Sequence, residues 1–199
     1  MKKGLIPVLV ILGILVLFLF GVIAWGVGHY NNFISFQAGV EEGWSQVEVQ
    51  YERRADLVPQ LVATVQGVAD FESSTLEEVT TARTNWLNTM VDETASREDQ
   101  MEASTSFDSA LSRLLVSVES YPTLTATDSF QTLLAQLEGT ENRIAVARKD
   151  YNAVVTTYNV AIKKVPQALI ANLFGFENSL YFESEEGSEQ APEVQFDFE

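Results

Sequence analysis

An uncharged apolar run, from Gly4 to Val27, constrains this chain more than any other feature of its sequence. The run is about 24 residues long, and at ~1.5 Å per residue a helix of that length crosses a hydrocarbon core of ~30 Å with some tilt. A cleaved signal peptide usually has an apolar region of only ~7–15 residues that ends in small residues, which WGVGHYNN does not resemble. We therefore expect an uncleaved transmembrane anchor over residues 1–29.

The residues that flank this run indicate its orientation. Trp25, His29 and Tyr30 lie where aromatic side chains collect at a membrane interface. Lys2 and Lys3 are the only basic residues close to either end of the run, and the positive-inside rule then places the N-terminus in the cytoplasm. The sequence thus predicts a single-pass membrane protein whose remaining residues lie outside the cytoplasm.

Composition excludes several classes of site and partner. The chain has 28 Asp and Glu against 12 Lys and Arg, and so acidic a surface repels nucleic acid. It has no cysteine, and its single histidine is His29. Such a domain cannot build a two-His zinc site, the Glu-x-x-His pairs of di-iron bundles or a Ser-His-Asp triad. We therefore expect no catalytic residue, no metal site and no cofactor.

Beyond Tyr30, apolar residues recur every three or four positions in three long segments, which is typical of amphipathic helices. Their core-facing positions are Phe33, Phe36, Val40, Trp44, Val47, Tyr51, Arg54, Val58, Leu61, Val65 and Val68; Leu76, Val79, Arg83, Trp86, Met90, Phe107, Leu111, Leu114, Val118 and Tyr121; and Phe130, Leu133, Leu137, Glu141, Ile144, Arg148, Tyr151, Val155, Tyr158, Ile162 and Val165. Segments of similar length joined by short turns predict an all-α fold. It consists of one N-terminal transmembrane helix and an elongated antiparallel bundle of three long helices, over residues 30–182.

The middle segment has two interpretations. Its apolar residues keep one heptad phase from Leu76 to Tyr121, which favours a single continuous helix. A polar stretch interrupts them, however, and Ser96 with Asp99 offers a fresh helix cap. A break near residues 92–97 would give the bundle four helices.

Caps and prolines mark the other helix boundaries. Ser74 and Glu77 have the form of a capping box, and the stretch Thr125 to Asp128 can cap the third long segment. Pro59 lies inside the first segment and predicts a local kink there. Residues 183–199 are acidic and rich in turn formers, which predicts a disordered tail.

Four charged residues occupy core-facing positions of the predicted helices: Arg54, Arg83, Glu141 and Arg148. A bundle tolerates charges there only if they are paired or border solvent. We interpret them as a structural set that fixes the register of the helices, as polar residues do in coiled coils. A small anion bound by several of these arginines is the alternative.

Many short motifs together resemble the LemA family of bacterial membrane proteins. They are Tyr30-Asn31, Trp44-Ser45, Arg53-Arg54-Ala55-Asp56-Leu57-Val58-Pro59 with Leu61-Val62, Glu119-x-Tyr121-Pro122-x-Leu124, Glu138-Gly139-Thr140-Glu141-Asn142-Arg143-Ile144-Ala145, Arg148-x-x-Tyr151-Asn152, Tyr158-Asn159, Pro166 and Phe174-Gly175-Phe176. The likeness extends from about Tyr30 to Glu183, and it departs from the family pattern at Gln66, at Val68 and through 85–105. The candidate functional residues in these motifs are Arg53, Asp56, Pro59, Tyr121, Asn142, Arg143, Tyr151 and Asn152.

The resemblance implies an anchored helical bundle without known enzymatic activity, in a family that includes proteins of magnetosome membranes. Four-helix bundles are described for the family, which supports a break in the middle segment. Function does not follow from the fold. We expect a structural or adaptor protein of a bacterial cell membrane, which presents its bundle to a protein partner or to further copies of itself. A sensor that holds a small anion between helices and an accessory adaptor of a membrane protease are the alternatives.

Overall fold

The computed structural model describes residues 5–67 and 71–182, with side chains described from residue 9 onward. Every regular element in these ranges is a helix: α1 (Leu5–Gln66), α2 (Ser73–Val91), α3 (Arg97–Val118), α4 (Pro122–Thr125), α5 (Asp128–Lys163) and α6 (Ala168–Phe174). The predicted all-α fold is confirmed. The predicted tail, residues 183–199, lies outside the described residues.

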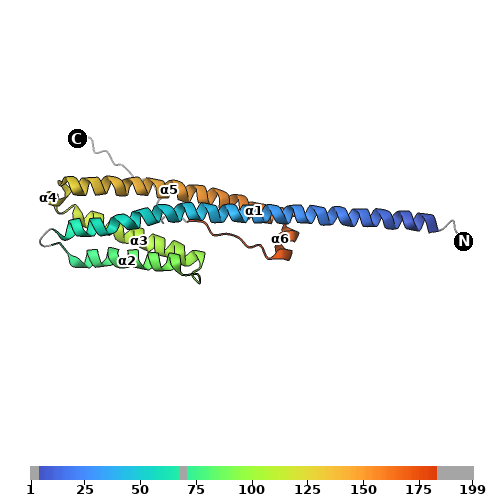
Figure 1. Cartoon of the computed structure of the whole chain (residues 1–199), viewed down its shortest axis with the longest axis horizontal. Helices are drawn as coiled ribbons and strands as arrows, with labels where there is room; N and C mark the ends of the chain where they lie inside the picture. The colour runs from blue at the N-terminus through green and yellow to red at the C-terminus, as the bar shows by residue number, and fades with distance from the viewer. Residues whose placement is uncertain (1–4, 68–70, 183–199) are drawn as a thin grey trace, which may run out of the picture.

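Helix α1 joins the apolar run to the bundle without a break. It is 62 residues long, and its N-terminal part extends alone beyond the rest of the molecule (Figure 1). The most apolar window of this helix has a mean hydropathy of 2.8 and none of it is buried. In the described part of the chain, α1 is the one helix long and apolar enough to cross a membrane.

Of the two alternatives for the middle segment, the structure forms the broken one. Helix α2 ends at Val91, and Asp92 Oδ1 accepts hydrogen bonds from the N–H and the hydroxyl of Thr94, at 2.8 and 2.7 Å. Helix α3 then starts with a capping box, in which the Ser96 hydroxyl accepts from the Asp99 N–H and the Asp99 carboxylate accepts from the Ser96 N–H. These contacts provide hydrogen-bond partners for backbone groups at the break. Apolar residues can therefore keep one heptad phase through this segment although it forms two helices.

The other two predicted caps have different outcomes. Thr127 Oγ1 accepts a hydrogen bond from the Phe130 N–H at 3.3 Å and caps α5, within the predicted stretch. The predicted box of Ser74 and Glu77 does not form. Helix α2 starts at the residue before Ser74, with Glu72 as its N-cap, and the Ser74 hydroxyl donates to the Glu72 carboxylate at 2.8 Å.

The two longest helices, α1 and α5, lie side by side, and the α2–α3 hairpin lies along the end of this pair that is far from the N-terminus (Figure 1). After α6 the chain turns back as an extended segment, residues 175–182, which we call the strap. Within the described residues most predicted core-facing positions are buried, whereas Phe36 and Val165 are 38% and 87% exposed. Val68 lies outside the described residues. The largest fully buried side chains are Trp86, Tyr51, Tyr151, Phe33 and Phe107.

Pro59 lies inside α1 and leaves one carbonyl group without its helical partner. A proline has no N–H, so the carbonyl oxygen four residues earlier, that of Ala55, receives no bond from the helix backbone. Arg83 of α2 donates to this oxygen through Nε at 2.6 Å. Ala55 is fully buried, so Arg83 supplies a donor that water cannot supply there. This contact explains why α1 continues to Gln66.

We expect the substitutions Arg83→Ala and Pro59→Ala to be energetically coupled. Alone, Arg83→Ala should lower the free energy of unfolding by about 1–3 kcal/mol, because it leaves a buried carbonyl unsatisfied. In a Pro59→Ala background the new N–H of residue 59 can serve Ala55, and the same change should cost clearly less. Chemical unfolding of the detergent-solubilised chain, followed by circular dichroism, measures both. An equal cost in the two backgrounds would contradict this account.

Candidate functional site

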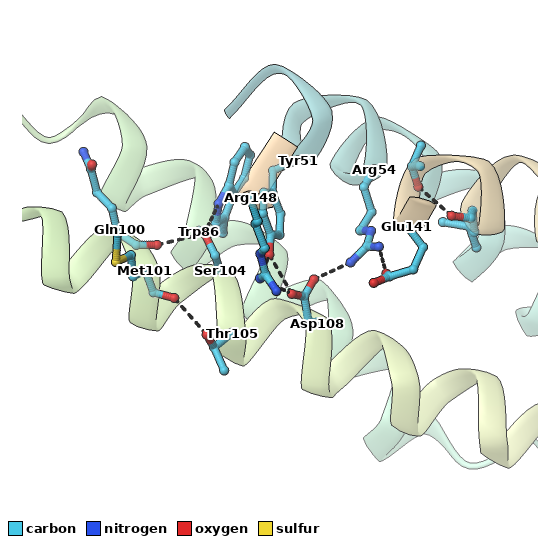
Figure 2. Close-up of polar contacts among 12 residues, drawn as sticks. Tyr51, Arg54, Trp86, Gln100, Met101, Ser104, Thr105, Asp108, Glu141 and Arg148 are labelled. Carbon is cyan, nitrogen blue, oxygen red and sulfur yellow. Dashed lines mark hydrogen bonds and ion pairs between the residues drawn. The ribbon is translucent and has the colours of Figure 1, made fainter. Parts of the chain in front are cut away.

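Three of the four predicted core-facing charges converge at the centre of the bundle, and they do so around residues of α1 and α3. Figure 2 shows Arg54 of α1 and Glu141 and Arg148 of α5 together with Tyr51 of α1 and Asp108 of α3. We call these five residues the charged cluster. The fourth predicted charge, Arg83 of α2, is not part of this cluster and instead donates to the Ala55 carbonyl group.

Asp108 is the centre of the charged cluster. One of its carboxylate oxygens accepts a hydrogen bond from Arg54, and the other accepts from the Tyr51 hydroxyl at 2.6 Å and from Arg148 at 2.7 Å. The Asp108 side chain is 14% exposed and that of Arg54 only 3%. A single carboxylate therefore connects α3 to both α1 and α5.

Helical spacing places these side chains. On α1, Tyr51 and Arg54 are three residues apart, and on α5, Glu141 and Arg148 are seven apart, so each pair lies on one face of its helix. On α3, Asp108 directly follows Phe107, which is fully buried. Asp108 therefore lies at the border of the core-facing side of α3.

Glu141 plays a smaller part than its core-facing position predicted. It forms an ion pair with Arg54, but its side chain is 63% exposed. The acid that faces the arginines away from water is Asp108. The predicted core-facing position of Glu141 is therefore corrected: the buried residues of this stretch of α5 are Leu137, Thr140 and Ile144, and Glu141 lies at the solvent-facing edge beside them.

The Tyr51 hydroxyl stays protonated in this environment. Burial raises its pKa above the ordinary value of 10.0, and the nearby Asp108 carboxylate raises it further. The hydroxyl can thus donate to Asp108 while it accepts from Arg148. The ring also lies 5.7 and 5.3 Å from the guanidinium carbons of Arg54 and Arg148 and packs against Trp86.

Asp108 was not among the predicted site residues, although the sequence contains a signal for it. The predicted core-facing positions carry three arginines and one glutamate. Buried charges have to be compensated, so further acids were to be expected beside the core-facing residues. Asp108 lies between two of them, Phe107 and Leu111.

The predicted family-motif residues do not converge on one site. They divide into exposed positions on α1 (Arg53, Asp56, Pro59), exposed positions on α5 (Asn142, Arg143), a ring contact with Phe71 near the turn after α3 (Tyr121) and contacts with the strap (Tyr151, Asn152). Two of these groups belong to surfaces described next.

Two asparagine side chains of α5 hold the strap by its backbone. Asn159 donates to the Ser179 carbonyl oxygen at 2.9 Å and accepts from the Ser179 N–H at 2.8 Å. Asn152 makes the same pair of bonds with Phe182, both at 2.9 Å. The Tyr151 hydroxyl donates to a further strap carbonyl at 3.0 Å. The strap therefore replaces part of its missing backbone hydrogen bonds with side chains of α5.

Phe182 ends the described part of the strap in an aromatic pocket. Its ring is stacked on Trp44 at 5.4 Å and lies edge-on to Tyr151 at 5.7 Å. The guanidinium carbon of Arg148 lies 4.8 Å from the Phe182 ring centre. Because Arg148 also binds Asp108, the strap reaches the edge of the charged cluster.

A groove of about 610 Å³ lies between α1 and α5, lined in part by Gly39, Gly43, Asn142 and Val146. The helices approach closely at Gly43, where a Cβ atom would be only 3.0 Å from Cγ2 of Val154. At Gly39 nothing lies within 4 Å of the corresponding position. The groove is therefore open above a tight helix contact.

In the part of the chain that the structure describes, acidic and histidine side chains do not gather as a metal site would require. Within residues 5–67 and 71–182, no group of three or more His, Cys, Asp or Glu residues is placed to hold a metal ion. The acids of the charged cluster, Asp108 and Glu141, are instead bound to arginine side chains.

We expect Asp108→Ala to destabilise the bundle far more than Glu141→Ala. The first change removes the acid partner that is itself shielded from water and leaves the buried Arg54 guanidinium with the mostly exposed Glu141, so it should lower the free energy of unfolding by about 3–5 kcal/mol. The second removes a mostly exposed partner and should cost no more than about 1 kcal/mol. Thermal and chemical unfolding of the solubilised chain compares them, with the exposed Asp56→Ala as control. An equal loss of unfolding free energy in Asp108→Ala and Glu141→Ala would contradict the central role of Asp108.

Comparison with known proteins assigns most of this chain to one family. The model of the LemA family matches residues 43–196. The magnetosome protein MamQ 2 of Paramagnetospirillum magneticum is 28% identical over 203 aligned positions, which cover 92% of this chain and 75% of that protein. Protein LemA of Metamycoplasma hominis is 24% identical over 160 positions, covering 80% of this chain and 71% of the other. Since the family match spans most of the sequence, this chain belongs to the LemA family.

Proposed function

We propose that this chain is a membrane-anchored structural or adaptor protein without enzymatic activity, which holds a helical bundle away from the membrane for contact with other proteins or further copies of itself. The observation that carries the proposal is the continuity of α1. One helix of 62 residues contains both the apolar run and a side of the bundle. The bundle therefore cannot swing on a flexible linker.

The length of α1 supports this role. At ~1.5 Å per residue the helix is about 93 Å long, and a hydrocarbon core takes up only ~30 Å of it. The rest extends into the bundle, where the charged cluster fixes it to α3 and α5. A rod of this kind suits a scaffold that presents a surface at a set distance from a membrane.

The surface that we propose for contact is the groove between α1 and α5. It combines the open position at Gly39 with apolar and polar side chains, among them Val146, which is 58% exposed, and the exposed Asn142 and Arg143. Such a mixture is common in interfaces between proteins. The two family-motif residues in this groove are the reason to prefer it over other exposed faces.

The contacts favour this proposal over an anion sensor. Arg54 and Arg148 are already bound to Asp108, Glu141 and the Tyr51 hydroxyl. Two positive and two negative charges balance within the cluster, so it holds no surplus charge for an anion. An accessory role for a membrane protease is a special case of the adaptor proposal, and the identity of the partner decides between them.

The orientation of the bundle is part of the proposal. The positive-inside rule applied to Lys2 and Lys3 places the bundle outside the cytoplasm of a bacterial cell. We expect protease added to intact protoplasts to digest the bundle, as shown by an antibody against it. Complete protection until the protoplasts are lysed would reverse the orientation.

Photo-crosslinking in native membranes tests the groove. A photoreactive amino acid in place of Val146 should give discrete adducts, and mass spectrometry should identify them as this chain or one recurring partner protein. The control position is Val116 of α3, which is similarly exposed at 66% and lies outside the groove, so it should give no such adduct. Equal adducts at both positions, or none at Val146, would contradict the proposed surface.

A further inference from the structure

The short helix α6 is held against α1 at the level where the uncharged apolar run ends. Cδ1 of Ile170 lies 3.9 Å from the Cβ position of Gly26. The ring centres of Phe174 and Tyr30 are 4.9 Å apart. The apolar run of α1 ends at Val27, so α6 lies beside the point at which α1 would leave the hydrocarbon core. Figure 1 shows α6 next to α1, at the start of its isolated part.

The face of α6 that points away from α1 is apolar. Ile170 and Ala171 are buried, whereas Leu169 and Leu173 are 71% and 78% exposed. The two leucines are four residues apart and therefore lie on one face of the helix. Phe174 packs one side of its ring against Tyr30 of α1 and still leaves the ring 58% exposed beside this face. This face has no cover within the described residues.

The distribution of charge at this end favours a lipid surface as the cover. No acidic residue occurs in residues 1–40 or 151–176, although the chain contains 28 of them. Lys163 and Lys164 are exposed and precede α6 by a few residues, while Glu177 follows it. The negative charge that keeps the rest of the protein away from anionic lipid is therefore largely absent here.

We propose that α6 lies in the membrane interface beside α1, with Leu169 and Leu173 in the boundary of the acyl chains and with Lys163 and Lys164 at anionic headgroups. Interfacial helices bury an apolar face ~5–10 Å into this boundary. The proposal rests on the membrane-spanning role proposed for α1. Lipid suits this face better than a second copy of the chain, because the face is continuous with the exposed apolar surface of α1.

Single-cysteine labelling of the full chain tests this placement. The chain has no cysteine of its own, so each variant carries one environment-sensitive fluorophore. The three positions are Leu173→Cys on α6, Leu17→Cys in the apolar run and Val91→Cys at the end of α2, whose native side chains are 78%, 73% and 78% exposed. The vesicles are phosphatidylcholine with phosphatidylglycerol, and contain lipids that carry a nitroxide quencher on the acyl chain.

We expect blue-shifted emission and several-fold stronger quenching at Leu173 than at the equally exposed Val91. Quenching at Leu17 but not at Leu173 overturns the placement of α6 and leaves the anchor intact. An absence of quenching at Leu17 overturns the anchor itself. Blue-shifted emission at Leu173 without quenching assigns this face to a protein contact and also overturns the proposal.

The role of the two lysines has its own test. In vesicles of phosphatidylcholine alone, or with the double substitution Lys163→Gln and Lys164→Gln, quenching at Leu173 should fall relative to vesicles with phosphatidylglycerol, while quenching at Leu17 stays constant. Quenching at Leu173 that depends on neither change removes the headgroup contact from the proposal.

Discussion

The register of α1, α3 and α5 depends on the hydrogen bonds and ion pairs that the Asp108 carboxylate accepts. Apolar packing has no preferred direction, and helices with a regular repeat can slide past one another by one repeat at little cost. The bonds from Arg54, Arg148 and Tyr51 to Asp108 exist in only one register of α1, α3 and α5. Any slip would leave charges buried without partners, which costs far more than imperfect packing.

The strap covers a part of the α1–α5 pair that the short α2–α3 hairpin does not reach. The hairpin covers one end of the α1–α5 pair, and the strap lies over part of the rest. Asn152 and Asn159 are seven residues apart, which is ~10.5 Å along a helix. Ser179 and Phe182 are three residues apart, which is ~10 Å along an extended chain. Because these lengths match, both amides can bind the backbone of one straight segment.

The residues that repeat along one helix are the ones that sequence alone could place. The three- and four-residue spacing predicted the bundle part of α1, α5 and nearly all core-facing positions, because it depends only on neighbours in the same helix. It did not predict that the apolar run and the bundle share one unbroken helix. Sequence alone does not decide whether the chain breaks before Ser96, since the apolar phase favours one helix and the capping residues favour two. Asp108 and the strap were missed because their partners are distant in sequence: Asp108 lies 54 residues from Arg54, and Phe182 lies 30 from Asn152. Glu141 is exposed because the neighbouring Thr140 takes the buried position between Leu137 and Ile144, and an apolar pattern does not single out a buried threonine.

Because α1 is continuous, its tilt and rotation in a membrane would set where the far end of the bundle lies. A single transmembrane helix can tilt and rotate about its own axis, and spanning helices tilt by ~20° on average. In the proposed anchored state about 60 Å of α1 lies beyond the hydrocarbon core, so a tilt of ~20° would displace its far end by about 20 Å. The contacts of Ile170 and Phe174 with Gly26 and Tyr30 hold α6 to one side of α1. If that side rests on lipid, rotation of α1 is fixed as well as its tilt, and the groove between α1 and α5 faces one direction relative to the membrane.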